Sequence, residues 1–236
     1  MDNNDNKGIR LNKYLSEAGI CSRRAADALI EEGKVFVDGK KAEVGTRVFP
    51  SSKVVVDGQK VEIKAKKVVL AYNKPVGIEC TSDRSNKDNI IDAVGYPERV
   101  YTIGRLDKNS CGLILLTNDG DLAYRISKAD ERHQKEYNVV IDRPIDDAFI
   151  KKMEDGVEIL GKKTAPARVY PKSDKSFNIV MIQGMNRQIR RMCEECGAKV
   201  RHLKRVRIMG LRLGDLEPGK YRVLTDDEVD MLYRQS

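Results

Sequence analysis

The sequence predicts an α+β protein built from a small helical unit with hairpins and a larger unit with a mostly antiparallel sheet. After an expected disordered tail at residues 1–8, helical spacing gives way to short β-branched segments over residues 9–64. Residues 68–236 hold strand-like segments and helices without a regular β-α alternation, which favours α+β over α/β. The polar stretch 63–67 is the expected hinge between the two domains.

Two helices are expected at the start of the first unit. Apolar residues at helical spacing run from Leu11 to Ala18, and Gly19 should end this helix. Ser22 is a favourable N-cap for a second helix over residues 23–32. The unit as a whole is too small to hold a large core.

Hairpins should come after these helices. Val35–Val37 precede the turn Asp38-Gly39, and Val54–Val56 precede the turn Asp57-Gly58. Asp-Gly after β-branched residues is a strong hairpin signal, because both turn residues tolerate a positive φ. The first unit is therefore expected to be a compact ααβ domain.

The second unit is expected to mix strands and helices. Apolar segments predict strands at residues 68–72, 100–103, 113–116, 137–141 and 177–182. Helical patterns lie at residues 122–126, 146–153, 187–196 and 226–233. Asn186 is expected to cap the third of these helices, and Thr225 with Glu228 has the spacing of a capping box for the fourth.

The charge distribution indicates a polyanionic partner. The net charge is +8, and residues 184–212 alone hold nine Arg or Lys against two Glu. Such a dense basic cluster is most simply explained by nucleic acid. The chain has no apolar run long enough to span a bilayer, and its first residues do not resemble a signal peptide, so a cytoplasmic protein is expected.

The five cysteines do not predict a metal site. An odd number without an export signal favours free thiols. Cys193 and Cys196 have the spacing of half a zinc site or of a redox pair, but no second Cys-x-x-Cys is present. Two thiols on one helix that ends at Gly197 is the favoured interpretation. No metal is expected.

Residues 104–117 are the most informative stretch of the chain. Asp107 lies between Arg105 and a turn of small residues, directly before an apolar strand. A single carboxylate lacks the partner that acid–base catalysis usually needs. It is able to act as a nucleophile where a cation keeps it ionised and water is scarce.

The pattern G-R-L-D-x-x-S-x-G-L at this loop resembles the active-site loop of the RsuA/RluF family of pseudouridine synthases. Three further segments match the family in the same order: residues 73–77, 135–137 and 184–192. The resemblance implies an enzyme that isomerises uridine within RNA, on a pseudouridine synthase catalytic domain, without a cofactor. It implies that Asp107 is the catalytic carboxylate. It leaves open whether Asp107 adds to the ribose or abstracts a sugar proton.

The resemblance also implies roles for the residues around Asp107. Arg190 would pair with Asp107 and keep it charged. Tyr137 would pack against the flipped base in place of lost stacking, or be a core tyrosine at the start of a strand. Leu203 would wall the base pocket or be an ordinary core residue. Arg105 would enter the RNA stack or contact a phosphate. The remaining basic residues expected to meet RNA are Arg187 and Arg191, and Lys204 and Arg205 on the basic face of a strand over 203–208.

The first unit resembles the αL RNA-binding domain of a small-subunit ribosomal protein (S-four) and of several RNA-modifying enzymes. The matching segments are R-L-N-K-Y-L, C-S-R-R and G-x-V-x-V-D-G-K. Arg10, Lys13, Arg23 and Arg24 are expected to crowd one end of the two helices and bind RNA, helped by a helix N-terminus. The alternative is a solvated basic face on a small stabilising domain.

Within the family, the chain is most similar to the branch of RluF-type large-subunit ribosomal RNA synthases. The expected partner is therefore ribosomal RNA or its assembly intermediate, with a tRNA anticodon uridine as a further substrate. We expect a monomer. The alternatives from other classes are a non-catalytic RNA-binding protein and a carboxylate-dependent glycosidase, although no second carboxylate lies near Asp107 in the sequence.

Overall fold

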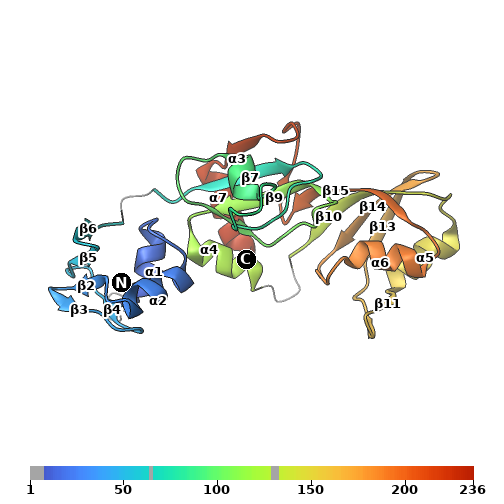
Figure 1. The fold of residues 1–236 in the computed structure, drawn as a ribbon. Helices are drawn as coiled ribbons and strands as arrows, with labels where there is room; N and C mark the ends of the chain where they lie inside the picture. The colour runs from blue at the N-terminus through green and yellow to red at the C-terminus, as the bar shows by residue number, and fades with distance from the viewer. Residues whose placement is uncertain (1–7, 64–65, 129–132) are drawn as a thin grey trace. The chain divides into compact units, whose positions relative to one another are not determined.

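A computed structural model describes residues 8–63, 66–128 and 133–236. The chain divides into two units, Met1–Lys67 and Val68–Ser236 (Figure 1). The tail expected at residues 1–8 lies outside the described residues except for Gly8, and residues 64 and 65 of the expected hinge also lie outside them.

Unit 1 contains two helices and short antiparallel strands. The helices are α1 (Leu11–Glu17) and α2 (Arg23–Glu31), and the side chain of Ser22 caps α2 by accepting from the Ala25 amide at 3.2 Å. One sheet has the order β3-β2-β5-β6, made of Lys40–Lys41, Val35–Val37, Val54–Val56 and Gln59–Val61. A second pair, which the sequence does not predict, joins β1 (Ile9–Arg10) to β4 (Arg47–Val48).

Local sequence sets the turns of unit 1, and apolar side chains hold it together. Asp38 and Gly39 have φ values of 51° and 78°, as a type I′ turn requires. Leu11 and Leu15 of α1 are buried against Ala26 and Ile30 of α2 and against the valines of the strands. The predicted ααβ arrangement is confirmed.

In the described part of unit 2, nine strands form one mostly antiparallel sheet. Its main path is β13 (Arg168–Ser173), β14 (Ser176–Met181), β10 (Lys135–Ile141), β15 (Val200–Ile208), β9 (Cys111–Thr117), β7 (Val69–Lys74) and β17 (Tyr221–Val223). At its side, β16 (Leu211–Arg212) pairs with β15, and β8 (Tyr101–Ile103) pairs with β9. The predicted α+β class with a mostly antiparallel sheet is confirmed.

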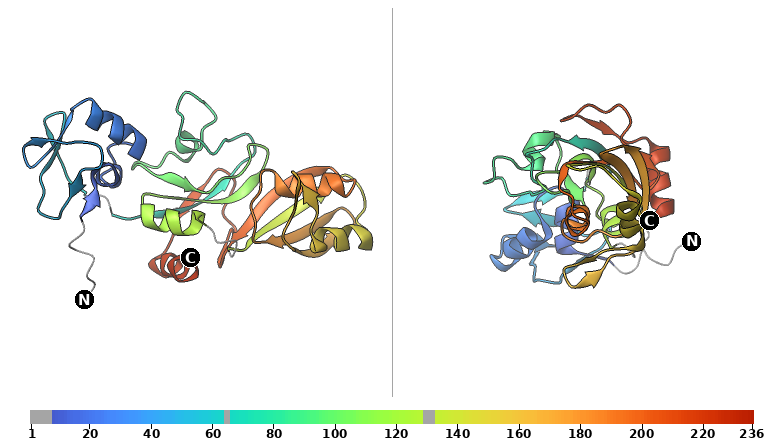
Figure 2. Two further views of the ribbon diagram at one scale, coloured as in Figure 1. Left: turned by 90° about the horizontal axis from the view of Figure 1, so that it is seen from below. Right: turned by 90° about the vertical axis from the view of Figure 1, so that its right-hand side faces the viewer.

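The helices of unit 2 cover different parts of this sheet (Figures 1 and 2). Side chains of α3 (Ile90–Val94) pack on one face of β7 and β9. Those of α4 (Gly120–Ser127) and α7 (Asp226–Gln235) pack on the other face. Next to β10, β13 and β14 lie α5 (Asp147–Asp155) and α6 (Gln188–Glu195), near a hairpin of β11 (Glu158–Ile159) and β12 (Lys162–Lys163). No helix among the described residues has the length and apolar character needed to cross a membrane.

The two halves of the sheet meet where β9 and β15 pair in parallel, Lys204 with Cys111 and Arg205 with Gly112. Gly112 has a φ of +101°, and a Cβ on it would lie 2.2 Å from the carbonyl oxygen of Arg205. Only glycine permits this close approach of two backbones. The glycine that comes after Asp107 in the sequence motif therefore joins the Asp107 loop to the half of the sheet that carries Tyr137.

Candidate active site

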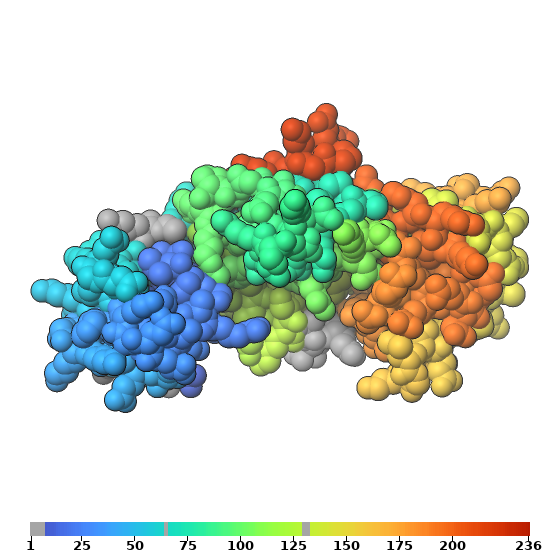
Figure 3. Space-filling model, viewed as in Figure 1, coloured from blue at the N-terminus to red at the C-terminus, as the bar shows by residue number. Residues whose placement is uncertain are grey.

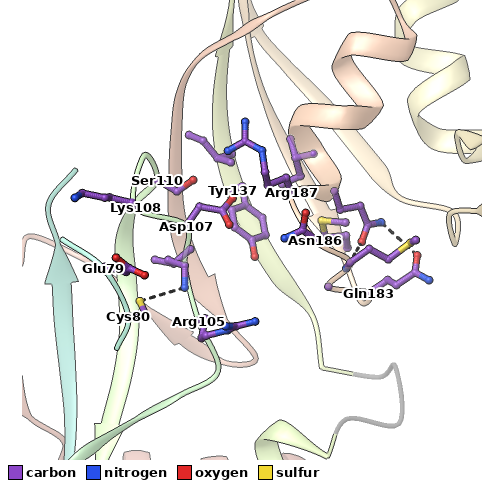
Figure 4. Close-up of a pocket in the computed structure, with 17 residues that line it drawn as sticks. Glu79, Cys80, Arg105, Asp107, Lys108, Ser110, Tyr137, Gln183, Asn186 and Arg187 are labelled. Atoms are coloured by element: carbon purple, nitrogen blue, oxygen red, sulfur yellow. Dashed lines mark hydrogen bonds between the residues drawn. The ribbon is translucent and has the colours of Figure 1, made fainter. Parts of the chain in front are cut away.

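A pocket of about 600 Å³ lies in unit 2 at this junction, and Asp107 and Tyr137 both line it. The green segments around the Asp107 loop and the orange segments around α6 meet there (Figure 3). In Figure 4, Asp107 and Tyr137 lie close together at the centre, with Arg187 and Asn186 on one side and Cys80 and Glu79 on the other. The pocket thus brings together residues that are 30 or more positions apart in the chain.

The loop that carries Asp107 is held by backbone hydrogen bonds and by two side chains. The Ser110 amide donates to the Asp107 carbonyl at 3.0 Å. The thiol sulfur of Cys80 accepts from the amide of Leu106 at 3.3 Å. Lys74 is fully buried and donates to the Lys108 carbonyl of this loop at 3.5 Å and to the Ile78 carbonyl at 2.7 Å, and burial lowers the pKa of its ammonium. Asp107 therefore projects from a fixed loop.

Tyr137 and Leu203 come from two paired strands. Tyr137 is on β10 opposite Arg205, and Leu203 of β15 pairs with Val139. Leu203 is 6% exposed and lines the pocket beside Tyr137. Tyr137 packs against the clusters on both sides of the junction, so its ring is fixed by both halves of the sheet.

The first turn of α6 forms one wall of the pocket. The N-cap residue of this helix differs from the prediction. Arg187, not Asn186, is the N-cap; it has a left-handed conformation with φ 51° and makes no side-chain capping bond. The Asn186 side chain accepts from Arg191 at 3.5 Å instead. Gln188 holds the turn, because its side-chain oxygen accepts from the Met185 amide at 2.9 Å. Strained backbone of this kind is concentrated at functional sites.

Arg190 of α6 makes its hydrogen bonds to the Asp107 loop and to the Val200 carbonyl. Its guanidinium donates to the Asn109 carbonyl at 2.7 Å and to the Ser110 hydroxyl at 3.3 Å. No ion pair joins Arg190 to Asp107 among the described residues, so the expected direct pair is not formed. Burial, followed by the charge of Arg187, lowers the pKa of Arg190, and the charge of Asp107 opposes both. Arg190 therefore contacts the loop that carries Asp107 and not the carboxylate itself.

The basic residues expected to meet RNA fall in different places. Arg105 and Arg187 are exposed and line the pocket. Arg191 donates from its Nε to the Asn186 carbonyl at 3.2 Å. Lys204 is partly exposed, on the face of β15 opposite to that of Leu203. Arg205 is only 4% exposed, and the expected alternation of apolar and basic faces over 203–208 is wrong. Arg205 is two residues after Leu203, so the strand period of two places both side chains on the same face, where β15 pairs with both β10 and β9.

In unit 1, the four basic residues lie at the starts of the two helices. Arg10 is exposed directly before α1, and Arg23 and Arg24 are exposed in the first turn of α2. Lys13 is within 3.6 Å of Glu17 one turn further along α1. Exposed cations at a helix N-terminus are able to bind phosphate oxygens.

The cysteines of α6 are thiols of the core. Cys193 is buried, and burial raises its pKa to about 12. Cys196 comes after it at the end of the helix, before Gly197 with a φ of +73°. Among the described residues, no group of three or more His, Cys, Asp or Glu is arranged to hold a metal ion.

Sequence reasoning missed the residues that hold the site in place. Cys80 and Gln188 were not singled out, although Cys80 supports the residue before Asp107 and Gln188 supports the turn before α6. Cys80 lies three residues after the matched segment 73–77, which is the one available signal. Gln188 lies within the matched segment 184–192, but its residue type and helical position do not distinguish it from an exposed helical glutamine.

Comparison with known proteins agrees with this geometry. The profile described as RNA pseudouridylate synthase matches residues 68–195, which include Asp107, Tyr137 and Arg190. The chain belongs to the RNA pseudouridine synthase family. Members of this family are isomerases that act on RNA. An S4 domain profile matches residues 9–52 of this pseudouridine synthase, in unit 1.

Several relatives share nearly the whole length of this pseudouridine synthase. The dual-specificity RNA pseudouridine synthase RluF of Escherichia coli O6:H1 is 49% identical over 96% of this chain and 79% of its own. The ribosomal large subunit pseudouridine synthase B of Bacillus subtilis is 39% identical over 94% of this chain and 95% of its own. A solved pseudouridylate synthase superposes with a TM-score of 0.69 at 27% identity, covering 95% of this chain and all of that one.

Proposed function

We propose that this pseudouridine synthase isomerises a specific uridine in large-subunit ribosomal RNA, with Asp107 as the catalytic carboxylate. The observation that carries the proposal is the meeting of Asp107 and Tyr137 in one pocket, from the two halves of the sheet. The name of the Bacillus subtilis relative supports a large-subunit target. The dual specificity named for the Escherichia coli relative supports a second RNA substrate, and we propose a tRNA anticodon uridine for it.

The proposed reaction takes place on a uridine flipped into the pocket. The uracil stacks on Tyr137, and Leu203 closes the pocket beside it, which offsets part of the cost of unstacking, a few kcal/mol. Asp107 assists breakage of the N1–C1′ bond, the uracil turns, and C5 bonds to C1′. N1 takes up a proton as C5 gives one up, so the reaction needs no oxidant, reductant or group donor.

The basic residues have separate proposed tasks. Arg105 contacts RNA at the space that the uridine leaves, and Arg187 contacts the backbone at the pocket's mouth. Arg190 positions the Asp107 loop. The first turns of α1 and α2 bind RNA away from the pocket, and Arg191 and Lys204 contribute charge near it. We propose that the protein acts as a cytoplasmic monomer.

Replacement of Asp107 by Asn tests the proposal. Asn keeps the size of the side chain but removes its charge, so pseudouridine formation on ribosomal RNA should fall at least about 1,000-fold while RNA affinity changes little. Pseudouridine is measured by mass spectrometry of the RNA, and affinity by filter binding. Asp107→Asn with wild-type activity would refute the catalytic assignment. Wild-type protein that binds RNA and leaves every uridine unchanged would indicate a non-catalytic RNA-binding protein.

A further inference from the structure

A second pocket, of about 460 Å³, adjoins the Asp107 pocket within unit 2. Arg105, Tyr137 and Met185 line both pockets, so a ligand in one lies beside a ligand in the other. The other walls of the second pocket are largely apolar. They are formed by one residue each from β8, β9, α4 and β15: Ile103, Leu115, Ile126 and Ile208. The volume exceeds that of a phosphate group and leaves room for an attached sugar.

The polar side of this second pocket is cationic. Lys135, Arg205 and Arg105 all line it, and none of its described lining residues carries a carboxylate. Burial, followed by the charge of Arg205, lowers the pKa of Lys135. Two cations beside apolar walls repel one another more strongly than they would in water. An anion between them would remove that cost.

Arg205 has an unused hydrogen-bond donor at this place. Its side chain is 4% exposed, and its Nε donates to the Leu113 carbonyl at 2.7 Å. Its Nη2 is shielded from solvent and has no hydrogen-bond partner among the described residues. A buried guanidinium nitrogen without an acceptor is costly, so it indicates a ligand that supplies one.

The strand pairing explains why these groups converge. Lys135 and Tyr137 are two residues apart on β10, so their side chains share a face of the sheet. Arg205 of β15 pairs directly with Tyr137 of β10. Lys135 donates to the carbonyl of His133 at 3.3 Å, and its ammonium has further donors to give.

We infer that the second pocket binds one phosphodiester group of the RNA substrate, next to the uridine that enters the Asp107 pocket. The inference rests on the proposed function, because a flipped uridine carries a phosphodiester on each side and the pockets share Tyr137 and Arg105. The phosphate oxygens accept from Nη2 of Arg205 and from Nζ of Lys135. This contact positions the nucleotide along its backbone and carries no sequence information.

Methylphosphonate substitution of single linkages tests the inference. A ribosomal RNA stem-loop on which the wild-type protein forms pseudouridine is prepared with one neutral methylphosphonate at each position around the target in turn. In the wild type, one linkage beside the target should weaken binding about tenfold or more, since a charge-assisted hydrogen bond is lost. The Lys135→Met variant should bind unmodified RNA more weakly than the wild type does, by a similar factor. A methylphosphonate at the same linkage should lower the affinity of this variant little further.

Two control variants keep the test interpretable. Lys151→Met removes an exposed lysine outside both pockets and should retain the full methylphosphonate profile. Lys135→Arg keeps the charge and should restore most of the affinity, which a merely structural role of the lysine would not predict. Thermal melting identifies any variant that is unfolded.

An unchanged methylphosphonate profile in folded Lys135→Met would overturn the inference. Wild-type affinity of that variant for unmodified RNA would overturn it as well. Both results leave the proposed function standing, because the wild type has formed pseudouridine in the same assay. Failure of the wild type to modify any RNA would instead overturn the proposed function.

Discussion

At the scale of single residues, the candidate site depends on groups that hold Asp107 rather than on Asp107 alone. Arg190 donates to the Asn109 carbonyl and the Ser110 hydroxyl, and Cys80 accepts from the Leu106 amide. These contacts fix the loop on both sides of the carboxylate. Catalysis is sensitive to displacements of about 1 Å, so the loss of either support should reduce the rate.

Replacement of Arg190 by Lys separates positioning from charge. Lysine keeps the positive charge but not the fork that reaches two acceptors. We therefore expect the single-turnover rate of pseudouridine formation to fall about 10- to 100-fold, with RNA affinity within about twofold of the wild type. A rate close to that of the wild type would mean that the charge alone matters. Arg168→Lys, at an exposed position on β13, is the matched control.

At the scale of elements, two features join separate parts of unit 2. The parallel pairing of β9 with β15 joins the two halves of the sheet at the site. The capping box of α7, in which Thr225 and Glu228 satisfy each other's backbone amides, starts the last helix. Glu228 also binds Arg222 of β17 at 2.6 Å, so it ties the helix to the edge of the sheet.

Replacement of Gly112 by Ala should separate the two halves of the sheet. A Cβ at this position would meet the Arg205 carbonyl at 2.2 Å, and the φ of +101° is unfavourable for alanine. We expect the free energy of unfolding to fall by about 3 kcal/mol or more. Gly161→Ala has a φ of +71° with nothing within 4 Å, so it should cost only about 1 kcal/mol. Equal effects of the two substitutions in urea unfolding would contradict the close approach.

Glu228 should make the stability of the protein depend on acid pH. Its hydrogen bond to Arg222 holds the pKa of this carboxyl below the ordinary value of 4.5. A carboxyl whose folded pKa is lowered stabilises the protein above its unfolded pKa, and this contribution is lost as the pH falls through the folded pKa. Glu228→Gln should therefore lower the Tm at pH 7, and the difference from wild type should shrink toward pH 3.

The control for this effect is Asp227→Asn in the same helical turn. It lacks the bond to Arg222, so its Tm difference should depend less on pH. Thermal denaturation between pH 3 and pH 7 measures both variants. A difference between Glu228→Gln and wild type that stays constant over this range would contradict the assignment.

At the scale of the whole molecule, the chain combines an S4 domain with a synthase domain, and each unit carries exposed basic residues. Flipping a base costs a few kcal/mol, which contacts elsewhere on the RNA must offset. A second RNA-binding unit supplies such contacts without altering the pocket. Substitutions in unit 1 should therefore change binding and leave the chemical step intact.

Replacement of both Arg23 and Arg24 by Ala tests this division. Each phosphate contact contributes about 0.7 to 0.9 to the magnitude of the slope of log K against log salt, so that magnitude should fall by up to about 2. KM for RNA should rise while the rate at saturation stays within about twofold. Lys60→Ala, an exposed unit 1 residue paired with Glu62, should leave the slope unchanged. An unaltered slope in Arg23→Ala/Arg24→Ala would indicate a solvated face.

Features that depend on neighbours along the chain could be predicted from the residues alone. The Asp-Gly turns, the Ser22 cap and the capping box at Thr225 lie where local chemistry requires them. The motif around Asp107 was also sufficient to indicate the family, because its residues are close together in the sequence. The helices and strands that the sequence predicts lie within a few residues of their expected bounds for the same reason, whereas α3, β13 and β17 were not predicted.

Features that depend on contacts between distant segments emerged only in three dimensions. The burial of Arg205 results from the pairing of β15 with both β10 and β9 at this residue, and the partners of Arg190 result from the pairing of β9 with β15. The left-handed Arg187 displaces Asn186 from its expected role as the cap. The pairing of distant strands and the close approach of their backbones are set by packing across the whole sheet, so the residue types of one segment do not determine them.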